Sequence, residues 1–214
     1  MVTSTTRRKR KAEVKIRGCE PGDLGAVAEI RSGPSVLAGT LAIPHTSVEE
    51  LRRRLGQTDP DTRTLVAQVG DKVLGYGALH LKGSPRLRHS AEIFMVVHEE
   101  HHGRGVGGAL LDALIELAER WCGVLRLHLS VFVDNTAAIA LYHSRGFIVE
   151  GVARAFALRD GQLVDCFVMA RVSPRLPWPQ ITAEDAAVRT PPQLTAGHDE
   201  SGNGHGRRKP GRSR

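Results

Sequence analysis

A strand-like segment that turns through glycines into an amphipathic helix constrains the fold most. Residues 88–97, RHSAEIFMVV, end in a run of apolar and β-branched side chains and predict a strand. Residues 98–105 contain two glycines, which favour a turn. From residue 104 to 122 apolar side chains recur at helical spacing and predict one buried face, formed by Val106, Leu110, Ala113, Leu114, Leu117 and Trp121. A strand, a turn and a helix in this order are typical of an α/β protein.

The rest of the chain alternates in a similar way. Strands are predicted at residues 13–17 and 124–133 and in two hairpins, 62–81 with its turn at Gly70-Asp71 and 147–172 with its turn at Asp160-Gly161. Helices are predicted at residues 21–32, 47–57 (capped by Ser47) and 135–146 (ended by Gly146). This order predicts a mixed α/β fold with one central sheet of about six to seven strands and about four helices.

The net charge of +7 suggests a nucleic-acid partner until the charges are located along the chain. Residues 1–12 hold five basic groups and no acidic one, and residues 173–214 hold seven basic and four acidic groups. Residues 13–172 therefore carry 18 basic and 19 acidic groups. We expect a nearly neutral domain at 13–172 between a disordered basic tail at 1–12 and a Pro/Gly-rich, disordered tail at 173–214. We expect no specific nucleic-acid partner; a weak, salt-sensitive contact through the tails is the alternative.

Membrane and secretory signals are not visible in the sequence. It has no run of about 18 apolar residues, and the charged N-terminus is not followed by an apolar stretch. The three cysteines are far apart and odd in number, which argues against a disulfide framework. We therefore expect a cytoplasmic protein without a membrane partner.

The segment HEEHH at residues 98–102 fits the zinc-protease pattern H-E-x-x-H. In such a protease both histidines lie in mid-helix, where they share a face and bind one metal ion. Here a strand-like segment precedes the pattern and Gly103 and Gly105 follow it. We interpret the match as coincidental, the histidines as exposed loop residues, and the chain as having no metal site.

The glycines that follow this segment favour a phosphate-binding site. A helix N-terminus leaves backbone N–H groups unpaired and carries a partial positive charge. Glycines at 103, 105, 107 and 108 would let a pyrophosphate approach those groups, and Arg104 adds a cation. A tight turn into a packed helix is the alternative interpretation.

A second candidate pair follows in DNTAAIALYHSRGF, residues 134–147. Asn135 and Tyr142 are seven residues apart, so on a helix they share a face about 10 Å apart along the axis. They could line an extended ligand. Alternatively, Asn135 only caps the helix and Tyr142 is a core aromatic residue.

The two segments together resemble the acetyl-CoA-binding motifs of the GNAT superfamily of N-acetyltransferases. VVHEEHHGRGVGGALL resembles the motif Q/R-x-x-G-x-G/A, and DNTAAIALYHSRGF resembles N-x-x-A-x-x-L-Y-x-x-x-G-F. The resemblance extends from about Val14 to Val172, and LSVFVDN, FALRDG and VDCFVMAR are similar to bacterial L-amino-acid N-acetyltransferases. It implies a GNAT-like fold, acetyl-CoA as co-substrate, a small-molecule amine as partner and a homodimer.

The resemblance also implies roles for individual residues. Backbone groups of Met95, Val96 and Val97 would pair with the pantetheine arm of acetyl-CoA where the sheet splays at a bulge. The turn would bind the pyrophosphate, through His102, Gly103, Arg104, Gly105, Val106, Gly107 and Gly108. Asn135 would hydrogen-bond the pantetheine arm, and Tyr142 would be the general acid at the thioester sulfur. His102 departs from the motif, because it occupies the usual Gln/Arg position.

The general base and the acceptor are less constrained. Glu92 could accept the proton of the amine directly or through water, or it is only an outward-facing strand carboxylate; His98 and His128 are further candidates. Leu41, Pro44 and His45 could wall the amine pocket. We expect a small amine such as an L-amino acid, with a protein N-terminus (including that of a ribosomal protein) or a non-catalytic CoA-binding regulatory role as alternatives. Cys166 is not expected to be a nucleophile, since no Cys-His pair is visible.

Overall fold

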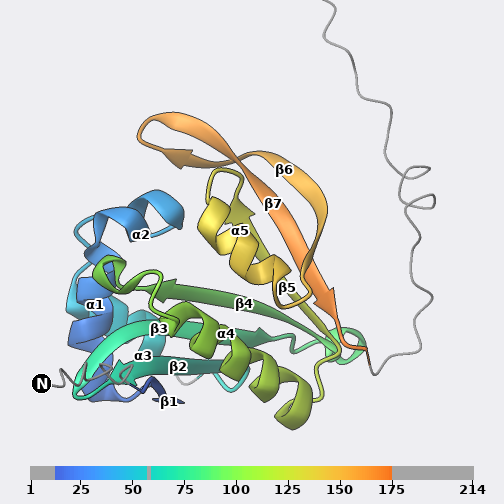
Figure 1. The fold of residues 1–214 in the computed structure, drawn as a ribbon, viewed down its shortest axis with the longest axis horizontal. Coiled ribbons are helices and arrows are strands. Elements are labelled where there is room, and N and C mark those ends of the chain that lie inside the picture. Colours follow the sequence, from blue (N-terminus) through green and yellow to red (C-terminus); the bar gives the residue numbers. More distant parts are fainter. Residues whose placement is uncertain (1–12, 57–58, 175–214) are drawn as a thin grey trace, which may run out of the picture. The chain divides into compact units, whose positions relative to one another are not determined.

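A seven-stranded sheet runs through the part of the chain that the computed structural model describes, residues 13–56 and 59–174 (Figure 1). Its strand order is β1-β2-β3-β4-β5-β7-β6, and every pair is antiparallel except β4 and β5. The predicted sheet is confirmed. Its strands are β1 (Lys15–Gly18), β2 (Thr62–Val69), β3 (Lys72–Leu81), β4 (Ser90–Val97), β5 (Arg126–Phe132), β6 (Ile148–Arg159) and β7 (Gln162–Val172).

Both predicted hairpin turns are present. The two-residue loops contain Gly70 with φ 57° and Asp160 and Gly161 with φ 50° and 78°. Such left-handed backbone matches the twist of the flanking strands and favours glycine or aspartate. Turn chemistry encoded in two residues thus fixes the pairing of β2 with β3 and of β6 with β7.

The described residues contain five α-helices, one more than predicted. The additional helix is α2 (Pro34–Gly39), whose six residues are too few to show a period, although Pro34 at its first turn is a start signal. None of the helices described is long and apolar enough to span a membrane. The others are α1 (Leu24–Ser32, after a 3-10 turn at Pro21–Asp23), α3 (Val48–Gly56), α4 (Val106–Glu116) and α5 (Thr136–His143).

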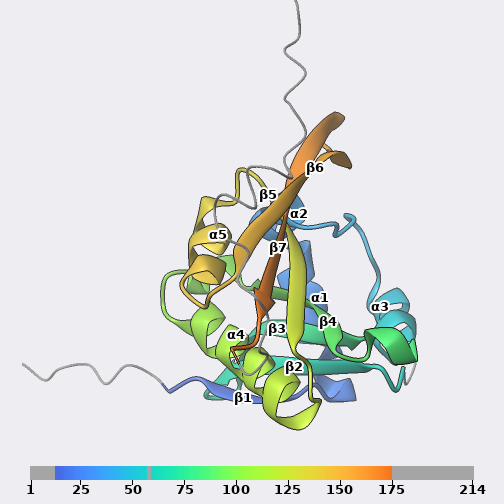
Figure 2. The same cartoon turned by 90° about the vertical axis from the view of Figure 1, so that its right-hand side faces the viewer.

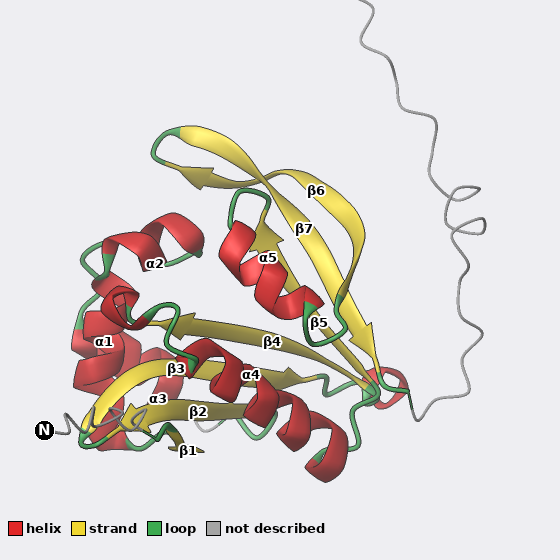
Figure 3. Ribbon diagram, viewed as in Figure 1, coloured by secondary structure: helices red, strands yellow, loops and turns green. Residues whose placement is uncertain are grey.

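The helices cover both faces of the sheet, as Figures 2 and 3 show. Buried Leu110 and Leu114 of α4 pack with Leu127 of β5 on one face. Val27 and Ile30 of α1 belong to a second buried cluster on the other. Two apolar layers therefore hold the sheet between them.

The end of the predicted 104–122 helix differs from the expectation. A π-helical turn, Leu117–Trp121, follows α4, and Cys122 N donates to Leu117 O five residues earlier. A π turn inserts one extra residue and rotates the helical faces. Ala118 is buried and Trp121 is 77% exposed. The prediction that Trp121 shares the buried face is wrong for this reason.

The sheet opens between β4 and β5. These strands pair only through residues 90–92 and 126–128, and their later residues diverge. Backbone groups on the inner edges of β4 and β5 are therefore left without a strand partner beyond Glu92 and His128. This opening determines where a ligand can enter the sheet.

Candidate active site

A cavity of about 640 Å³ lies at the opening between β4 and β5. Its walls come from β4, the end of β5, the 101–108 turn, α5 and α2. Most of the residues selected from the sequence line it, although they come from separate segments. They are Glu92, Met95, Val96, Val97, His102, Gly103, Gly105, Gly107, Gly108, Asn135 and Tyr142.

The glycines of the turn have two distinct structural functions. Gly103 and Gly105 have φ 69° and 87°, a conformation that side chains disfavour, and Gly105 is the N-cap of α4. A Cβ on Gly107 would lie 3.4 Å from Leu141 Cδ2, and one on Gly108 would lie 2.9 Å from Arg145 Nη2. The first pair shapes the turn and the second lets α5 approach α4. Bare backbone N–H groups at a helix N-terminus fit an anionic pyrophosphate.

Two residues of the predicted turn do not line the cavity. Val106 is 2% exposed and belongs to the core under α4, and Arg104 is exposed and is not among the residues that line the cavity. Arg145, which the sequence did not single out, supplies a cation to the lining. Its guanidinium donates to Asp112 at 3.0 and 3.2 Å and lies beside Gly108.

His102 contacts another predicted site residue. Its Nε2 lies 2.9 Å from the carbonyl oxygen of Val97, and because a carbonyl only accepts, Nε2 is the donor. The register of β4 with β3 runs unbroken from Ala91 to Val97. The expected bulge at Met95–Val97 is therefore absent from the pairing of β4 with β3, whereas the expected splay is present between β4 and β5.

Asn135 and Tyr142 each have a structural role in α5 and also line the cavity. Asn135 caps α5, since its Oδ1 accepts from Ala138 N at 3.2 Å, and it also lines the cavity. Tyr142 is 8% exposed, packs against Phe147 with ring centroids 5.8 Å apart, and also lines the cavity. Burial raises the pKa of Tyr142 to about 12, so its hydroxyl stays protonated at neutral pH.

Glu92 lies in a row of ionisable side chains across three strands. His80 of β3 and His128 of β5 are its register partners. The Glu92 side chain is 46% exposed, and Lys82 Nζ lies 3.4 Å from its Oε2. Among the three candidates for the general base, Glu92 lines the cavity, whereas His128 and His98 do not. Burial is the main cause that lowers the pKa of His128, which favours the neutral form of that ring.

One wall of the cavity includes α2, whose end is bound by Arg159. Ser35, Val36, Gly39 and Leu41 line the cavity, but Pro44 and His45 do not. Arg159 Nη1 donates to the carbonyl of Ala38 at 3.0 Å, and its guanidinium pairs with Asp134 and lies 5.3 Å from the Phe132 ring centroid. Arg159 thus links the tip of β6, the end of α2 and the loop after β5.

Cys166 also lines the cavity, but as a thiol. Burial is the largest cause that raises its pKa to about 11. A thiol with this pKa is poorly nucleophilic at neutral pH. The expectation that Cys166 is not a nucleophile stays a prediction that agrees with this environment.

The 98–102 segment is a strand-to-helix turn, as the sequence predicted. β4 ends at Val97, a 3-10 turn covers Glu99–His101, and α4 begins at Val106. No α-helix runs through these described residues, so His98 and His102 do not share the face of an α-helix. The zinc-protease arrangement is therefore absent from this segment.

Comparison with known proteins places these features in context. The profile described as the acetyltransferase (GNAT) family matches residues 36–147. L-amino acid N-acetyltransferase AaaT of Escherichia coli (strain K12) is 37% identical over 161 residues, which is 75% of this chain and 99% of that protein.

Two solved structures share the fold. yncA from Salmonella typhimurium, solved with its cofactor acetyl-CoA, is 27% identical with a TM-score of 0.63, covering 79% of this chain and 99% of its own. Ribosomal-protein-alanine N-acetyltransferase from Brucella melitensis is 29% identical with a TM-score of 0.65, covering 74% and 99%.

Proposed function

The chain belongs to the acetyltransferase (GNAT) family, and from this premise we propose that it transfers the acetyl group of acetyl-CoA to the primary amine of a small molecule, an L-amino acid in particular. As a GNAT N-acetyltransferase it is an acyltransferase. The observation that carries the proposal is the cavity at the β4–β5 opening, with a glycine turn and Tyr142 in its wall.

The turn and the strand edge would hold the co-substrate. The N–H groups at Gly103–Gly108 would bind the pyrophosphate, and Arg145 would add a positive charge beside them. The free edge of β4 at Met95–Val97 and the amide of Asn135 would contact the pantetheine arm. Acetyl-CoA supplies the acetyl group as a thioester, whose transfer to an amine leaves a thiolate.

Tyr142 would protonate that thiolate. An ordinary tyrosine with a pKa of about 10 donates to a thiolate of pKa about 8.5 at a cost of ~2 kcal/mol. With a pKa of about 12 the cost rises to ~5 kcal/mol. The same apolar surroundings destabilise a buried thiolate and raise the pKa of the corresponding thiol. The difference in pKa between the tyrosine and the thiol is then smaller. Because the pKa of Tyr142 is about 12, its hydroxyl would be a fully protonated donor throughout the neutral pH range.

Glu92 would accept the proton of the amine. Glu92 lines the cavity from the middle of the sheet, and its side chain remains partly solvated. A water molecule can therefore pass the proton from the amine to the carboxylate. His128 on the next strand does not line the cavity, so Glu92 is the better placed of the two bases.

The wall that α2 contributes to the cavity favours a small acceptor over a protein N-terminus. A peptide needs an open groove, whereas α2 contributes a wall to this cavity and Arg159 binds the carbonyl of Ala38 in that helix. The likeness to ribosomal-protein-alanine N-acetyltransferase keeps the protein acceptor as the second candidate.

The test is thiol release from acetyl-CoA with a panel of amino acids, polyamines, amino sugars and N-terminal peptides. We expect turnover with one or more L-amino acids and none with peptides. Turnover with peptides alone would favour the protein acceptor. Acetyl-CoA binding without turnover of any amine would favour a CoA-binding regulatory module.

A further inference from the structure

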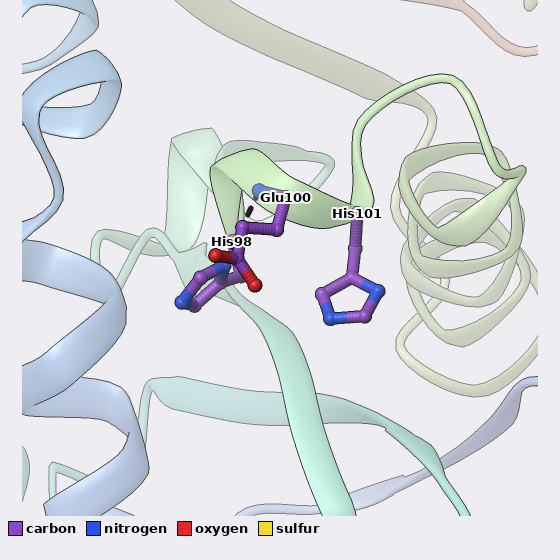
Figure 4. Close-up of side chains that lie close together, drawn as sticks. All are labelled: His98, Glu100 and His101. Atoms are coloured by element: carbon purple, nitrogen blue, oxygen red, sulfur yellow. Dashed lines mark hydrogen bonds between the residues drawn. The ribbon is translucent and has the colours of Figure 1, made fainter.

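The turn after β4 gathers three potential metal ligands outside the residues assigned to acetyl transfer. One ligand atom each of His98, Glu100 and His101 lies within 4.8 Å of the other two. Figure 4 shows that both rings and the carboxylate extend to the same side of the turn. These residues do not form the helix-borne site of a zinc protease, but a site within the turn has a different geometry and different ligands.

The backbone explains why these side chains converge. His101 N donates to His98 O at 2.9 Å and closes one 3-10 turn. In a 3-10 helix, side chains three residues apart eclipse each other. The two rings accordingly lie with centroids 5.7 Å apart in an edge-on arrangement.

The neighbouring residues are engaged elsewhere. Glu99 Oε2 accepts from Ser35 N of α2 at 3.1 Å, and His102 Nε2 donates to the carbonyl of Val97. His98 Nδ1 accepts a hydrogen bond from Glu100 N at 3.3 Å, so this nitrogen carries a lone pair directed at the turn.

The donor set fits a divalent transition-metal ion. Two imidazoles and one carboxylate are ligands that Zn²⁺ and Co²⁺ accept, with bonds of about 2.0–2.2 Å. Ligand atoms around a tetrahedral ion are then about 3.4 Å apart. Since Glu100 is exposed and both histidines are only partly buried, side-chain rotation on the turn can close the remaining distance.

We propose that His98, Glu100 and His101 bind one divalent ion of the Zn²⁺ class, with water completing its coordination. His101 also lines the cavity, so the ion lies at the rim of the co-substrate site, on the side of the glycine turn. Acetyl transfer does not depend on this ion, because the proposed acid and base are elsewhere in the cavity.

The test is metal titration of the full chain without an affinity tag, followed by the visible absorption of bound Co²⁺ and by calorimetry with Zn²⁺. We expect one site per chain, and an affinity that falls by about tenfold or more in His98→Gln and in His101→Gln. His89→Gln is the matched control, since His89 is an exposed histidine outside the turn and its loss should leave the affinity unchanged.

Thermal unfolding of each variant verifies that it is folded, which is expected because the changes are confined to a surface turn. Binding of equal strength in wild type, His98→Gln and His101→Gln would overturn the proposal. So would a wild type that binds neither ion.

Discussion

Tyr142 separates a catalyst from a protein that only binds its ligand. Tyr142→Phe removes one hydroxyl and keeps the ring that packs on Phe147. If the hydroxyl donates the proton, kcat should fall by roughly 10²–10³, within the usual range for general acid catalysis. KM for acetyl-CoA should change little, because the lost interaction belongs mainly to the transition state. Steady-state kinetics with the best amine from the panel measure both values. An unimpaired variant would transfer the acid role to water or another residue.

Gly105 tests the co-substrate site independently of the chemistry. Gly105→Asp adds a strained side chain at φ 87° and a negative charge in the cavity wall. Repulsion of the pyrophosphate should weaken acetyl-CoA binding by about 100-fold or more, the effect of losing about 3 kcal/mol. Calorimetry with CoA measures this directly.

The control is the same substitution at Gly70. This glycine also has a positive φ, at 57°, and no other atom lies within 4 Å of the position that a Cβ would take there. Gly70→Asp should leave CoA affinity unchanged, because the β2–β3 turn is not part of the cavity lining. Equal loss in both variants would mean that strain, and not the phosphate site, causes the effect.

At the scale of elements, an ion pair fastens β1 to the start of the first helical segment. Arg17 donates to both oxygens of Asp23 at 2.7 and 2.8 Å, and the Asp23 side chain is only 10% exposed. Asp23→Asn removes the charge, and we expect it to lower the free energy of unfolding by about 1.5–3 kcal/mol at pH 7. Denaturant unfolding measures the change, and Asp71→Asn, at an exposed turn, should have little effect.

The pH dependence of this loss follows from the sign of the shift. The Arg17 guanidinium holds the pKa of Asp23 below its usual value. The stabilisation is therefore complete above the unfolded pKa of about 4 and disappears as the pH falls through the lower folded pKa. The difference between wild type and Asp23→Asn should shrink in acid, and a constant difference would argue against the ion pair.

Arg159 positions α2, which lines the cavity, against the loop after β5. Arg159→Lys keeps the charge, but an ammonium group cannot pair with Asp134, reach the carbonyl of Ala38 and stack on Phe132 together. We expect KM for the amine to rise about tenfold, equivalent to about 1.4 kcal/mol, while CoA affinity changes less than about twofold. Arg126→Lys, which breaks the pair with Glu150 outside the cavity, is the control. Equal loss of amine and CoA affinity would indicate a general structural role.

At the scale of the whole molecule, the domain boundary remains a proposal. The expectations for residues 1–12 and for residues beyond 174 lie outside the described residues. Residues 13–172 are nearly neutral, and the residues lining the cavity fall between Ser35 and Cys166. Deleting residues 1–12 and 180–214 should therefore change the melting temperature by less than about 2 °C, a shift that corresponds to less than about 1 kcal/mol, and should preserve acetyl-CoA affinity.

A shorter chain provides the contrast. Ending it before β7 would remove the strand that pairs with both β5 and β6, so that chain should not fold. Insolubility of residues 13–179 as well would show that the proposed boundary is misplaced.

Size-exclusion chromatography of the full chain tests the expected homodimer.

Features that depend on neighbouring residues could be predicted from the sequence. Periodicity predicted all seven strands, and the turn residues at Gly70 and at Asp160-Gly161 predicted both hairpins. The glycines at 103–108 and the cap at Asn135 were also visible, because turns and helix ends are determined by contacts within a few residues. Helix α2 was missed because six residues contain no full amphipathic repeat.

Contacts between distant residues emerged only from the folded chain. Arg159 contacts Ala38 across 121 positions of the chain, and Arg145 reaches Asp112 across 33. The exposure of Trp121 depends on a π turn, and the approach of His98, Glu100 and His101 depends on a 3-10 turn. Sequence periodicity reports only on residues that are close in the chain, so it cannot predict such contacts. The position of β7 between β5 and β6 and the opening beside β4 arise only when the sheet is assembled.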